Sequence, residues 1–561
     1  MHRRWVAFGV ALGIAILMAL LAPSGWPAGD GSVVVEYQGQ TIIETDVRLG
    51  ATEEIVAETS AEDLNFTLVF PSGLPLEGEI VASVSAATDG VSQRLFSQDI
   101  EIRVISPNIG GELIPVTGWD DEKLALDAVR RPPQDAAVVL GLLGLVVVLW
   151  VTEALPLFVT SLLIPVVLVF SGVAGAVEAT APFFNPIIVL FFAGFLMAEA
   201  MKRTGLDHLL AVSITAQARH SPAMLFGAMI GMTAVMSMFM SNTAAAAVLV
   251  PVAVAVSEPL DELGFRKALV LGIAYAATIG GVGSAIGTPA NQLAVEFLGE
   301  FVARDITFAE WFVFGLPMVI LFLPVMGWYL WRTSDVRVGG ERFAEVARLA
   351  LDERHRLGRP DRDQMVVLAV FAAVAIGWLT QTWHGLHAGI VALAGAAALY
   401  VLRKLDPEDL GRISWSSLLT FGGGLVLGLY IVRTGTSDYV ATRLAGLAGT
   451  PAILTLLIVA SITLVLTTVA SNTASAAVLI PLAIPLAGVL GMDATLLVLV
   501  VAIASSIDFA LVIGTPPTMI AYSTRLYTAG QIFRKGLALD LVGILILTVF
   551  VVRIWEALGV L

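Results

Sequence analysis

Long apolar stretches separated by short polar segments dominate the chain from about residue 135 onward. A stretch of about 20 apolar residues is long enough to cross the hydrocarbon core of a bilayer. We therefore expect ten membrane crossings in this region, over 136–153, 156–173, 184–201, 267–298, 308–331, 365–381, 387–402, 415–432, 492–526 and 536–556. Two further apolar stretches, 223–256 and 451–487, are interrupted at their centres by small polar residues, and we expect each to turn back as a hairpin.

The first 134 residues differ from the rest. The basic start Met1-His-Arg-Arg precedes an uncharged apolar run from Trp5 to about Ala22, which predicts either a signal peptide or a first membrane helix. Because no clear cleavage site of small residues follows the run, we favour a retained helix over 1–22, which brings the crossings to eleven. Between residues 23 and 134, apolar and polar positions alternate with breaks at Gly, Pro and Asp, a pattern typical of a small β-sandwich.

Composition narrows the class of protein. Of the 561 residues, 57% are hydrophobic and 14% are charged, against about 25% charged in soluble domains, so an ordinary water-soluble enzyme is excluded. The absence of cysteine excludes disulfides and thiolate zinc sites. The formal charge is −15 without a basic stripe, so we expect a lipid bilayer and no nucleic acid as partner. Residues 23–134 hold 19 acidic against 6 basic residues and therefore carry most of the negative charge.

The basic residues between the crossings predict the orientation. Segment 332–364 contains 8 Arg, whereas 174–183 and 299–307 contain one between them, and an excess of Lys and Arg marks cytoplasmic loops. We therefore expect a multi-pass protein of the inner (plasma) membrane, with a cytoplasmic amino terminus and the acidic β domain outside. This layout requires that 223–256 and 451–487 each enter and leave the membrane on one face, as re-entrant hairpins.

An internal repeat links the two halves of the membrane region. Ser241–Pro251 reads SNTAAAAVLVP and Ser471–Pro481 reads SNTASAAVLIP, so that 9 of 11 positions are identical at a spacing of 230 residues. Further along, GTPAN at Gly287–Asn291 corresponds to GTPPT at Gly514–Thr518. Similar sequences in halves of opposite orientation are typical of inverted-repeat transporters. The expected domains are a first helix at 1–22, the β domain at 23–134, repeat 1 at 135–331, a cytoplasmic loop at 332–364 and repeat 2 at 365–561.

The repeated motifs suit ions of opposite charge. Ser-Asn-Thr before an Ala-rich run is a strong helix start, and the free N–H groups and dipole of a helix start favour an anion. Pro289 and Pro516 lack an N–H and break their helices, which frees carbonyl oxygens for a small hard cation such as Na⁺. Neither hairpin contains a charged residue, so a bound anion would depend on co-bound cations to offset its charge.

In these paired motifs the chain resembles the divalent anion/sodium symporter family, the INDY-like transporters of dicarboxylates, citrate and sulfate, over about 1–22 and 135–561. The resemblance implies an all-α polytopic membrane protein with 11 transmembrane helices and two re-entrant hairpins in an inverted repeat. It also implies a homodimer that works by an elevator motion. The extracytoplasmic β-sandwich-like domain would be an insertion into this fold. Sodium ions would be the coupling ions, a small dianion the substrate, and no other cofactor is expected.

The resemblance further implies binding sites between each Ser-Asn-Thr tip and the Gly-Thr-Pro break of a neighbouring helix. The expected sodium ligands are Ser237, Ser241, Asn242 and Gly287 in one site, and Thr467, Ala470, Asn472 and Gly514 in the other. The expected substrate contacts are Ser241, Asn242, Thr243, Thr288, Pro289, Ser471, Asn472, Thr473, Thr515 and Pro516. One carboxylate of the substrate would lie near each tip.

Two residues depart from the family pattern. Thr518 stands where the family commonly has Asn, as at Asn291. Asp508 lies six residues before Gly514, in a position that the family usually fills with a small neutral residue. A carboxylate in the membrane is a functional candidate by default, and Asp508 could be a coupling residue that binds a cation or carries a proton, or it could pair with a polar neighbour.

These observations predict a secondary transporter that imports a small divalent anion with sodium, most simply a C4-dicarboxylate such as succinate, malate or fumarate. A sulfate or citrate symporter and a sodium-independent anion exchanger are alternatives. A membrane receptor or sensor that uses the β domain is a further alternative. We expect no enzymatic activity, because the membrane region shows no His/Cys/carboxylate cluster, no P-loop and no Ser-His-Asp constellation.

Overall fold

The structure is a computed structural model. It describes residues 10–16 and 18, the backbone of the strands between residues 29 and 126, and residues 132–560 apart from 218–220, 261, 339–342, 344–347, 349–350, 353, 445 and 447–448.

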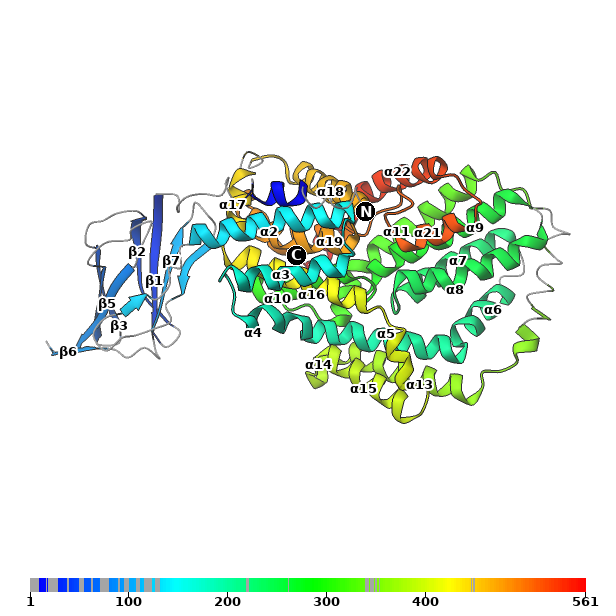
Figure 1. Ribbon diagram of the computed structural model, residues 1–561, viewed down its shortest axis with the longest axis horizontal. Helices are drawn as coiled ribbons and strands as arrows, with labels where there is room; N and C mark the ends of the chain where they lie inside the picture. The colour runs from blue at the N-terminus through cyan, green and yellow to red at the C-terminus, as the bar shows by residue number, and fades with distance from the viewer. Residues whose placement is uncertain are drawn as a thin grey trace.

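A bundle of helices forms the body of the molecule (Figure 1). The first half contains α2 (Pro132–Thr152), α3 (Leu157–Phe170), α4 (Ala176–Thr180), η1 (Ala181–Phe184), α5 (Pro186–Thr204), α6 (Leu206–Gln217), α7 (Pro222–Ser237), α8 (Asn242–Ser257), η2 (Glu258–Leu260), α9 (Leu263–Gly280), η3 (Gly281–Gly283), α10 (Pro289–Val302) and α11 (Phe308–Thr333). The second half contains α13 (Arg362–Leu379), α14 (Gln381–His384), α15 (Ala388–Val401), η4 (Pro407–Gly411), α16 (Trp415–Arg433), α17 (Thr436–Arg443), α18 (Ala452–Val469), α19 (Asn472–Leu490), α20 (Ala494–Ala504), α21 (Pro516–Ser523), α22 (Ala529–Leu545), η6 (Ile546–Val551) and α23 (Val552–Leu558).

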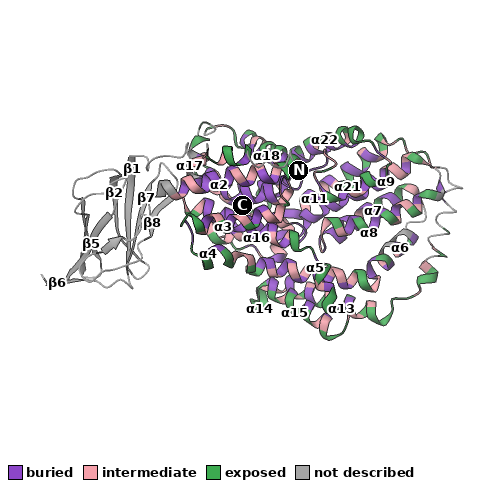
Figure 2. Ribbon diagram, viewed as in Figure 1, coloured by how far each residue is buried: buried purple, intermediate pink, exposed green. Residues whose placement is uncertain are grey.

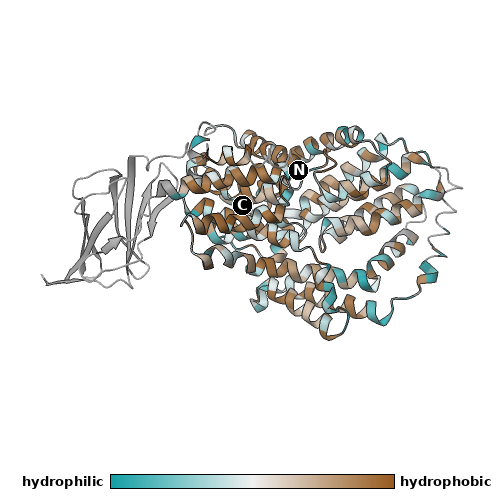
Figure 3. Ribbon diagram, in the orientation of Figure 1, coloured by the Kyte–Doolittle hydropathy of each residue, from teal (hydrophilic) through white to brown (hydrophobic). Residues whose placement is uncertain are grey.

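Helices α9 and α20 form the centre of this bundle. Both are apolar around almost their whole circumference and are buried along nearly their whole length, as expected of helices surrounded by other helices. Figure 2 shows the buried residues gathered where the helices meet. Hydrophobic residues predominate along most of these helices (Figure 3). Some large apolar side chains, such as Phe170 and Ile320, are exposed, which a lipid environment favours.

The helices of the structure differ in length and continuity from the predicted crossings. Among the described residues, nine helices are long and apolar enough to span a membrane. The expected crossings 156–173 and 387–402 form α3 and α15, which have 14 residues each and reach only about 21 Å. The expected crossings 267–298 and 492–526 are each interrupted, between α9 and α10 and between α20 and α21. The rest of the expected first helix outside residues 10–18 lies outside the described residues.

The two apolar stretches with polar centres do turn back on themselves. Helices α7 and α8 contact each other across a short turn, and both pack on α9. In the same way α18 and α19 contact each other and both pack on α20. The two halves of a single straight helix cannot pack against each other, so each pair is a hairpin. Helices α18 and α19 are nevertheless long enough to span a membrane by themselves.

The predicted fold class is also wrong in its β-sandwich. The strands are β1 (Gly29–Tyr37), β2 (Gln40–Leu49), β3 (Ile55–Ala61), β4 (Leu64–Phe70), β5 (Ile80–Thr88), β6 (Val91–Arg94), β7 (Ile100–Ser106), β8 (Gly111–Pro115) and β9 (Leu124–Leu126). They pair into two separate antiparallel sheets, ordered β2-β1-β7-β8 and β3-β4-β5-β6 with β9 beside β5. The hydrophobic core of the described residues lies in the helices, and no β-sandwich core is part of it. Alternation predicted the strands, but it carries no information on how sheets pack.

Candidate functional site

Each hairpin turn ends at a serine that caps the next helix. Ser241 Oγ accepts a hydrogen bond from Ala244 N at 3.2 Å at the start of α8, and Ser471 Oγ accepts one from Ala474 N at 3.2 Å at the start of α19. Both serines have an extended backbone. The helices therefore begin at the Asn of each Ser-Asn-Thr motif, as predicted, and their first N–H groups are directed out of the helix end.

A hydroxyl group on α7 connects the first turn to the central helix. Ser237 Oγ lies 2.7 Å from Asn242 Oδ1 and 2.6 Å from Ala277 O on α9. A hydroxyl carries one proton and can donate it to only one of these two oxygens. With the Asn242 amide in this orientation, one pair of oxygens lies at hydrogen-bond distance without a proton between them. A small cation stabilises such an arrangement, and we call Ser237 Oγ, Asn242 Oδ1 and Ala277 O the first oxygen cluster.

The second half contains the same arrangement. Thr467 Oγ1 on α18 lies 2.9 Å from Asn472 Oδ1 and 2.6 Å from Ser505 O. The hydroxyl and the amide follow the first half at the 230-residue spacing, and Ser505 takes the place of Ala277. Thr467 Oγ1, Asn472 Oδ1 and Ser505 O form the second oxygen cluster, to which the same argument about the single hydroxyl proton applies.

An asparagine amide holds together the break between α9 and α10. Asn291 Nδ2 donates to Gly281 O at 3.0 Å and to Ser284 O at 2.6 Å. Trp311 Nε1 on α11 donates to Val282 O at 3.0 Å. These bonds satisfy carbonyl groups that a broken helix would otherwise leave buried without a partner.

This break lies directly against the tip of α8. A Cβ added to Gly281 would lie 2.5 Å from Asn242 Oδ1, 2.8 Å from Thr288 Cγ2 and 3.0 Å from Gly287 O. Only glycine fits at such a close approach of the backbone. The structure therefore brings Gly287 and Thr288 of the Gly-Thr-Pro motif next to Asn242 of the Ser-Asn-Thr motif, a proximity that the family resemblance implied.

The break between α20 and α21 differs from the first in its side chains. Thr515 Oγ1 lies 2.9 Å from Thr518 Oγ1, where the first half has Thr288 beside Asn291. The carboxylate of Asp508 contacts Gly514, and a Cβ added to that glycine would lie 2.7 Å from Asp508 Oδ1. Asp508 is fully buried, and neither of its side-chain oxygens has a hydrogen-bond partner among the described atoms.

Two polar side chains fix the backbone next to Asp508. Asp540 Oδ1 on α22 accepts a hydrogen bond from Phe509 N at 2.9 Å, and Tyr275 on α9 donates its hydroxyl proton to Phe509 O at 2.8 Å. The second bond also ties the central helix of the first half to the break of the second half.

The helices that follow the two breaks cross between the halves. Helix α10 packs on α19 and α20, and α21 packs on α8 and α9. Both Gly-Thr-Pro motifs therefore open helices that lie against the hairpin of the opposite half.

The remaining expected residues lie at the same helix starts but make fewer contacts. In the described structure, neither Thr243 nor Thr473 makes a side-chain hydrogen bond, and Pro516 is exposed. Ala470 is buried, and its N–H donates to Leu466 O at 2.8 Å where α18 ends. Pro289 begins α10 directly after its cap Thr288. No described hydrogen bond joins the tip of one hairpin to the tip of the other.

Sequence reasoning missed three participants, Ala277, Ser505 and Gly281. The first two contribute main-chain carbonyls, which every residue type possesses, so no sequence signal could have found them. Gly281 could have been found by counting back six residues from Gly287, as Asp508 was found from Gly514.

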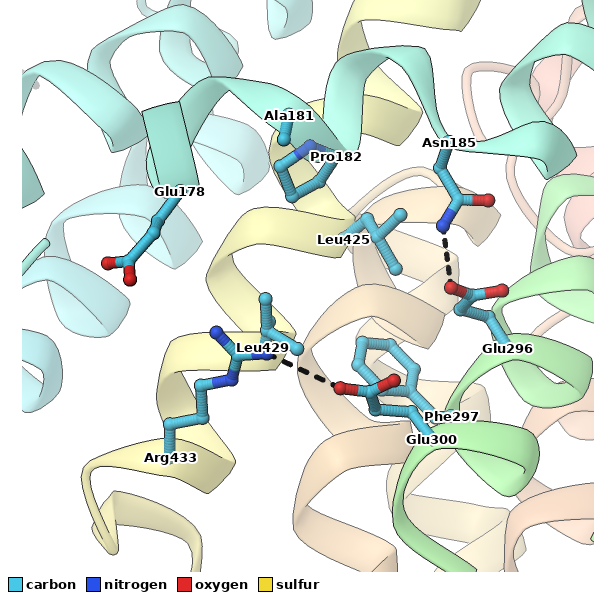
Figure 4. Close-up of a pocket in the computed structure, with 10 residues that line it drawn as sticks. All are labelled: Glu178, Ala181, Pro182, Asn185, Glu296, Phe297, Glu300, Leu425, Leu429 and Arg433. Atoms are coloured by element: carbon cyan, nitrogen blue, oxygen red, sulfur yellow. Dashed lines mark hydrogen bonds and ion pairs between the residues drawn. The ribbon is translucent and has the colours of Figure 1, made fainter. Parts of the chain in front are cut away.

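The structure also contains an acidic cavity that the sequence did not predict (Figure 4). It has a volume of about 300 Å³ and contains none of the expected site residues. Asn185 Nδ2 donates to Glu296 Oε1 at 2.6 Å, and Arg433 lies 3.3 Å from Glu300. Its lining consists of Glu178, Ala181, Pro182, Asn185, Glu296, Phe297, Glu300, Leu425, Leu429 and Arg433.

A second arginine at a helix end, Arg203, is held by two carboxylates. Arg203 at the end of α5 pairs with Asp409 at 2.6 Å and also with Asp406. Burial alone would raise the pKa of Asp409, but the N–H of Asp406 and the guanidinium of Arg203 outweigh it and hold that pKa below its usual range. This cluster and the pair of Arg433 with Glu300 are therefore ion pairs between helix ends.

In the part of the chain that the structure describes, no three His, Cys, Asp or Glu side chains converge in a way that could hold a metal. The candidate cation ligands are hydroxyl, amide and main-chain oxygens, which suit a weakly bound hard cation.

Comparison with known proteins identifies the family. Residues 131–561 match the sodium:sulfate symporter transmembrane region. An uncharacterized transporter of Haemophilus influenzae is 31% identical over 440 residues, which cover 74% of this chain and 91% of that protein. The sodium-dependent dicarboxylate transporter SdcS of Staphylococcus saprophyticus is 30% identical over 436 residues, which cover 72% of this chain and 83% of that protein.

Among solved structures, the YdaH transporter of Alcanivorax borkumensis overlaps with a TM-score of 0.48 and 15% identity, over 68% of this chain and 87% of that chain. This overlap is too small to support an argument. Nine helices among the described residues could span a membrane. With the match over residues 131–561 and the two relatives, this shows that the chain belongs to the sodium:sulfate symporter family and is a multi-pass membrane transporter, not an enzyme.

Proposed function

We propose that this protein is a sodium-coupled secondary transporter that imports a small divalent anion, a C4-dicarboxylate such as succinate, malate or fumarate. The observation that carries the proposal is the pair of matching oxygen clusters, each with three oxygens around one hydroxyl proton at the start of a capped helix. The sodium-dependent dicarboxylate transporter SdcS among the relatives supports the choice of substrate.

One sodium ion would bind at each oxygen cluster. The first site would comprise Ser237, Ser241, Asn242 and Gly287, with the carbonyl of Ala277 as an additional ligand. The second site would comprise Thr467, Ala470, Asn472 and Gly514, with the carbonyl of Ser505 as an additional ligand. Oxygens of these types bind a hard monovalent cation without a fixed charge of their own.

The dianion would lie between the two hairpin tips, with one carboxylate near each helix start. Free N–H groups and the dipole at the start of α8 and of α19 favour negative charge, and the adjacent sodium ions would offset the rest. Asn242 and Thr243 would contact one carboxylate, and Asn472 and Thr473 the other. The walls of the substrate site would be completed by the residues at the two helix breaks, which would lie beside the hairpin tips, namely Thr288, Pro289, Thr515 and Pro516.

The proposal includes the architecture that the family resemblance implies. The two halves would be inverted relative to each other, the hairpins would be re-entrant, and the strands between residues 29 and 126 would lie outside the cell. Two copies would form a homodimer in the inner membrane, and an elevator motion would carry the site across.

Uptake into proteoliposomes tests this proposal. Labelled succinate, sulfate and citrate are offered separately, with an inward sodium gradient or with choline on both sides. We expect sodium-driven uptake of succinate that unlabelled malate and fumarate inhibit. Preferred uptake of sulfate, the anion in the family's description, would identify sulfate as the substrate in place of a dicarboxylate. Uptake that does not depend on the sodium gradient would refute sodium coupling. Asn472→Ala should abolish uptake in a protein that still folds.

A further inference from the structure

We propose that Asp508 supplies a carboxylate oxygen to the cation at the second oxygen cluster, so that the second cation site carries a fixed negative charge and the first does not. This inference deepens the proposed sodium symport and rests on it.

The position of Asp508 corresponds to a glycine at the first site. Gly281 lies six residues before Gly287, and Asp508 lies six residues before Gly514. In each half the residue at this position contacts the glycine of the Gly-Thr-Pro motif. At the first site this position also touches Asn242 Oδ1, because a Cβ added to Gly281 would lie 2.5 Å from that oxygen. By this correspondence we infer that Asn472, a member of the second oxygen cluster, is the neighbour of Asp508 at the second site.

The carboxylate of Asp508 has no hydrogen-bond donor or counterion among the described atoms. Its side chain is fully buried, and both of its oxygens lack a hydrogen-bond partner among the described atoms. An isolated buried carboxylate is among the most costly groups that a protein can contain, and it requires a cation or a set of donors. Without donors, such a group either takes up a proton or binds a cation, and the adjacent oxygen cluster is where a cation would bind.

The helices of the second hairpin and of the second break cannot provide that cation. The hairpin helices α18 and α19 and the interrupted helices α20 and α21 contain no Lys, Arg or His. The titratable groups that face this segment are Asp540 on α22 and Tyr275 on α9. Asp540 is acidic, and both groups already bond to the backbone of Phe509. We therefore assign the compensating charge to a sodium ion that enters the site, in place of a proton on Asp508.

The difference between the sites has a functional consequence. A charged ligand binds a cation more tightly than neutral oxygens do, and ligand charge tunes the affinity of such sites. The second site would hold its sodium ion before the dianion arrives, whereas the first site, with neutral ligands alone, would gain most of its affinity from the bound dianion.

Thermal unfolding of the purified protein without substrate tests the role of Asp508. Asp508→Asn keeps the shape of the side chain and removes its charge. In sodium-free choline buffer we expect this variant to unfold at a higher temperature than the wild type, because an uncompensated buried charge is gone. Sodium should then stabilise the wild type more than the variant, and the sodium concentration for half-maximal stabilisation should be about tenfold higher in the variant, or more.

Asp540→Asn is the matched control, since it neutralises an equally buried carboxylate but keeps the oxygen that accepts the N–H of Phe509. We expect its half-saturating sodium concentration to equal that of the wild type. Should Asp508→Asn fail to fold, Asp508→Gly, which copies Gly281, replaces it.

Sodium-driven succinate uptake separates the two possible failures. If the wild type shows no sodium-dependent stabilisation and no sodium-driven uptake, the proposed function fails and the inference with it. If the wild type shows both, and the Asp508 variant has the same sodium dependence and is no more stable without sodium, then Asp508 is not a ligand and only this inference fails. A loss of sodium affinity in Asp540→Asn but not in Asp508→Asn would likewise overturn it.

Discussion

Replacing Thr467 by valine tests the second oxygen cluster with little change in shape. The substitution exchanges one hydroxyl for a methyl group. The hydroxyl lies 2.9 Å from Asn472 Oδ1 and 2.6 Å from Ser505 O, and its single proton can serve one of them. The structural loss is therefore one hydrogen bond, about 1 kcal/mol of the free energy of unfolding. The loss at a bound sodium ion is one ligand oxygen, for which we expect a decrease in affinity of at least about tenfold.

Thr463 provides the control for this variant. It lies one turn earlier on α18, is fully buried like Thr467, and donates its hydroxyl proton to Val459 O at 2.8 Å. Thr463→Val should therefore lower the free energy of unfolding by the same ~1 kcal/mol, with no effect on sodium. Thr467→Ser, which keeps the hydroxyl, should restore most of the sodium affinity.

The assay is the sodium dependence of succinate uptake in proteoliposomes, measured together with the unfolding midpoint with and without sodium. Thr467→Val should raise the half-saturating sodium concentration about tenfold, while Thr463→Val leaves it unchanged. If both valine variants show the same sodium dependence, the three-oxygen arrangement is only a structural contact and the reasoning is refuted.

Three further predictions concern the first oxygen cluster and the ion pair between Arg203 and Asp409. Gly281→Ala should abolish uptake, because the added Cβ would lie 2.5 Å from Asn242 Oδ1. Gly227→Ala, whose Cβ meets nothing within 4 Å, should transport normally. Normal uptake by both variants would show that the close contact at Gly281 is not needed for transport. Asn242→Ala should lose uptake yet unfold as a single cooperative transition, and retained uptake would remove its amide from the site. Asp409→Asn should lower the free energy of unfolding by about 1 kcal/mol at neutral pH. The pKa of Asp409 is lowered in the folded protein. The stabilisation is therefore fully present above the unfolded pKa of about 3.9 and is lost as the pH falls through the folded pKa. The gap in unfolding midpoint between wild type and variant should thus narrow below about pH 4, and a gap that is constant with pH would contradict the ion pair with Arg203.

The sequence was sufficient for features that depend on one residue's own chemistry. Ser241 and Ser471 cap helices because their hydroxyls reach a nearby N–H, and Pro289 and Pro516 mark where the helices restart. It was insufficient where structure depends on packing between segments. The carbonyls of Ala277 and Ser505 enter the clusters only because α9 and α20 lie beside the hairpins.

The hydropathy pattern also gave wrong helix lengths and a wrong packing of the sheets, for a physical reason. Apolar character shows that a segment avoids water but does not fix where a helix begins and ends, so α3 and α15, with 14 residues each, are shorter than the expected crossings 156–173 and 387–402. Alternation between residues 23 and 134 likewise indicates strands without specifying their partners, and the strands form two sheets where a sandwich was expected.

The crossing of helices between the halves gives the two proposed cation sites a physical connection. Helix α10 starts at the break beside the first oxygen cluster and packs on α19, whose first residue is Asn472 of the second cluster. Helix α21 starts at the second break and packs on α8, whose first residue is Asn242. An ion that fixes one break therefore also restricts the helix against which the other tip must close. Two ligands that favour the same arrangement of shared elements necessarily strengthen each other's binding. Sodium and the dianion would thus be coupled through these two crossed helices, even though no described hydrogen bond joins the two tips.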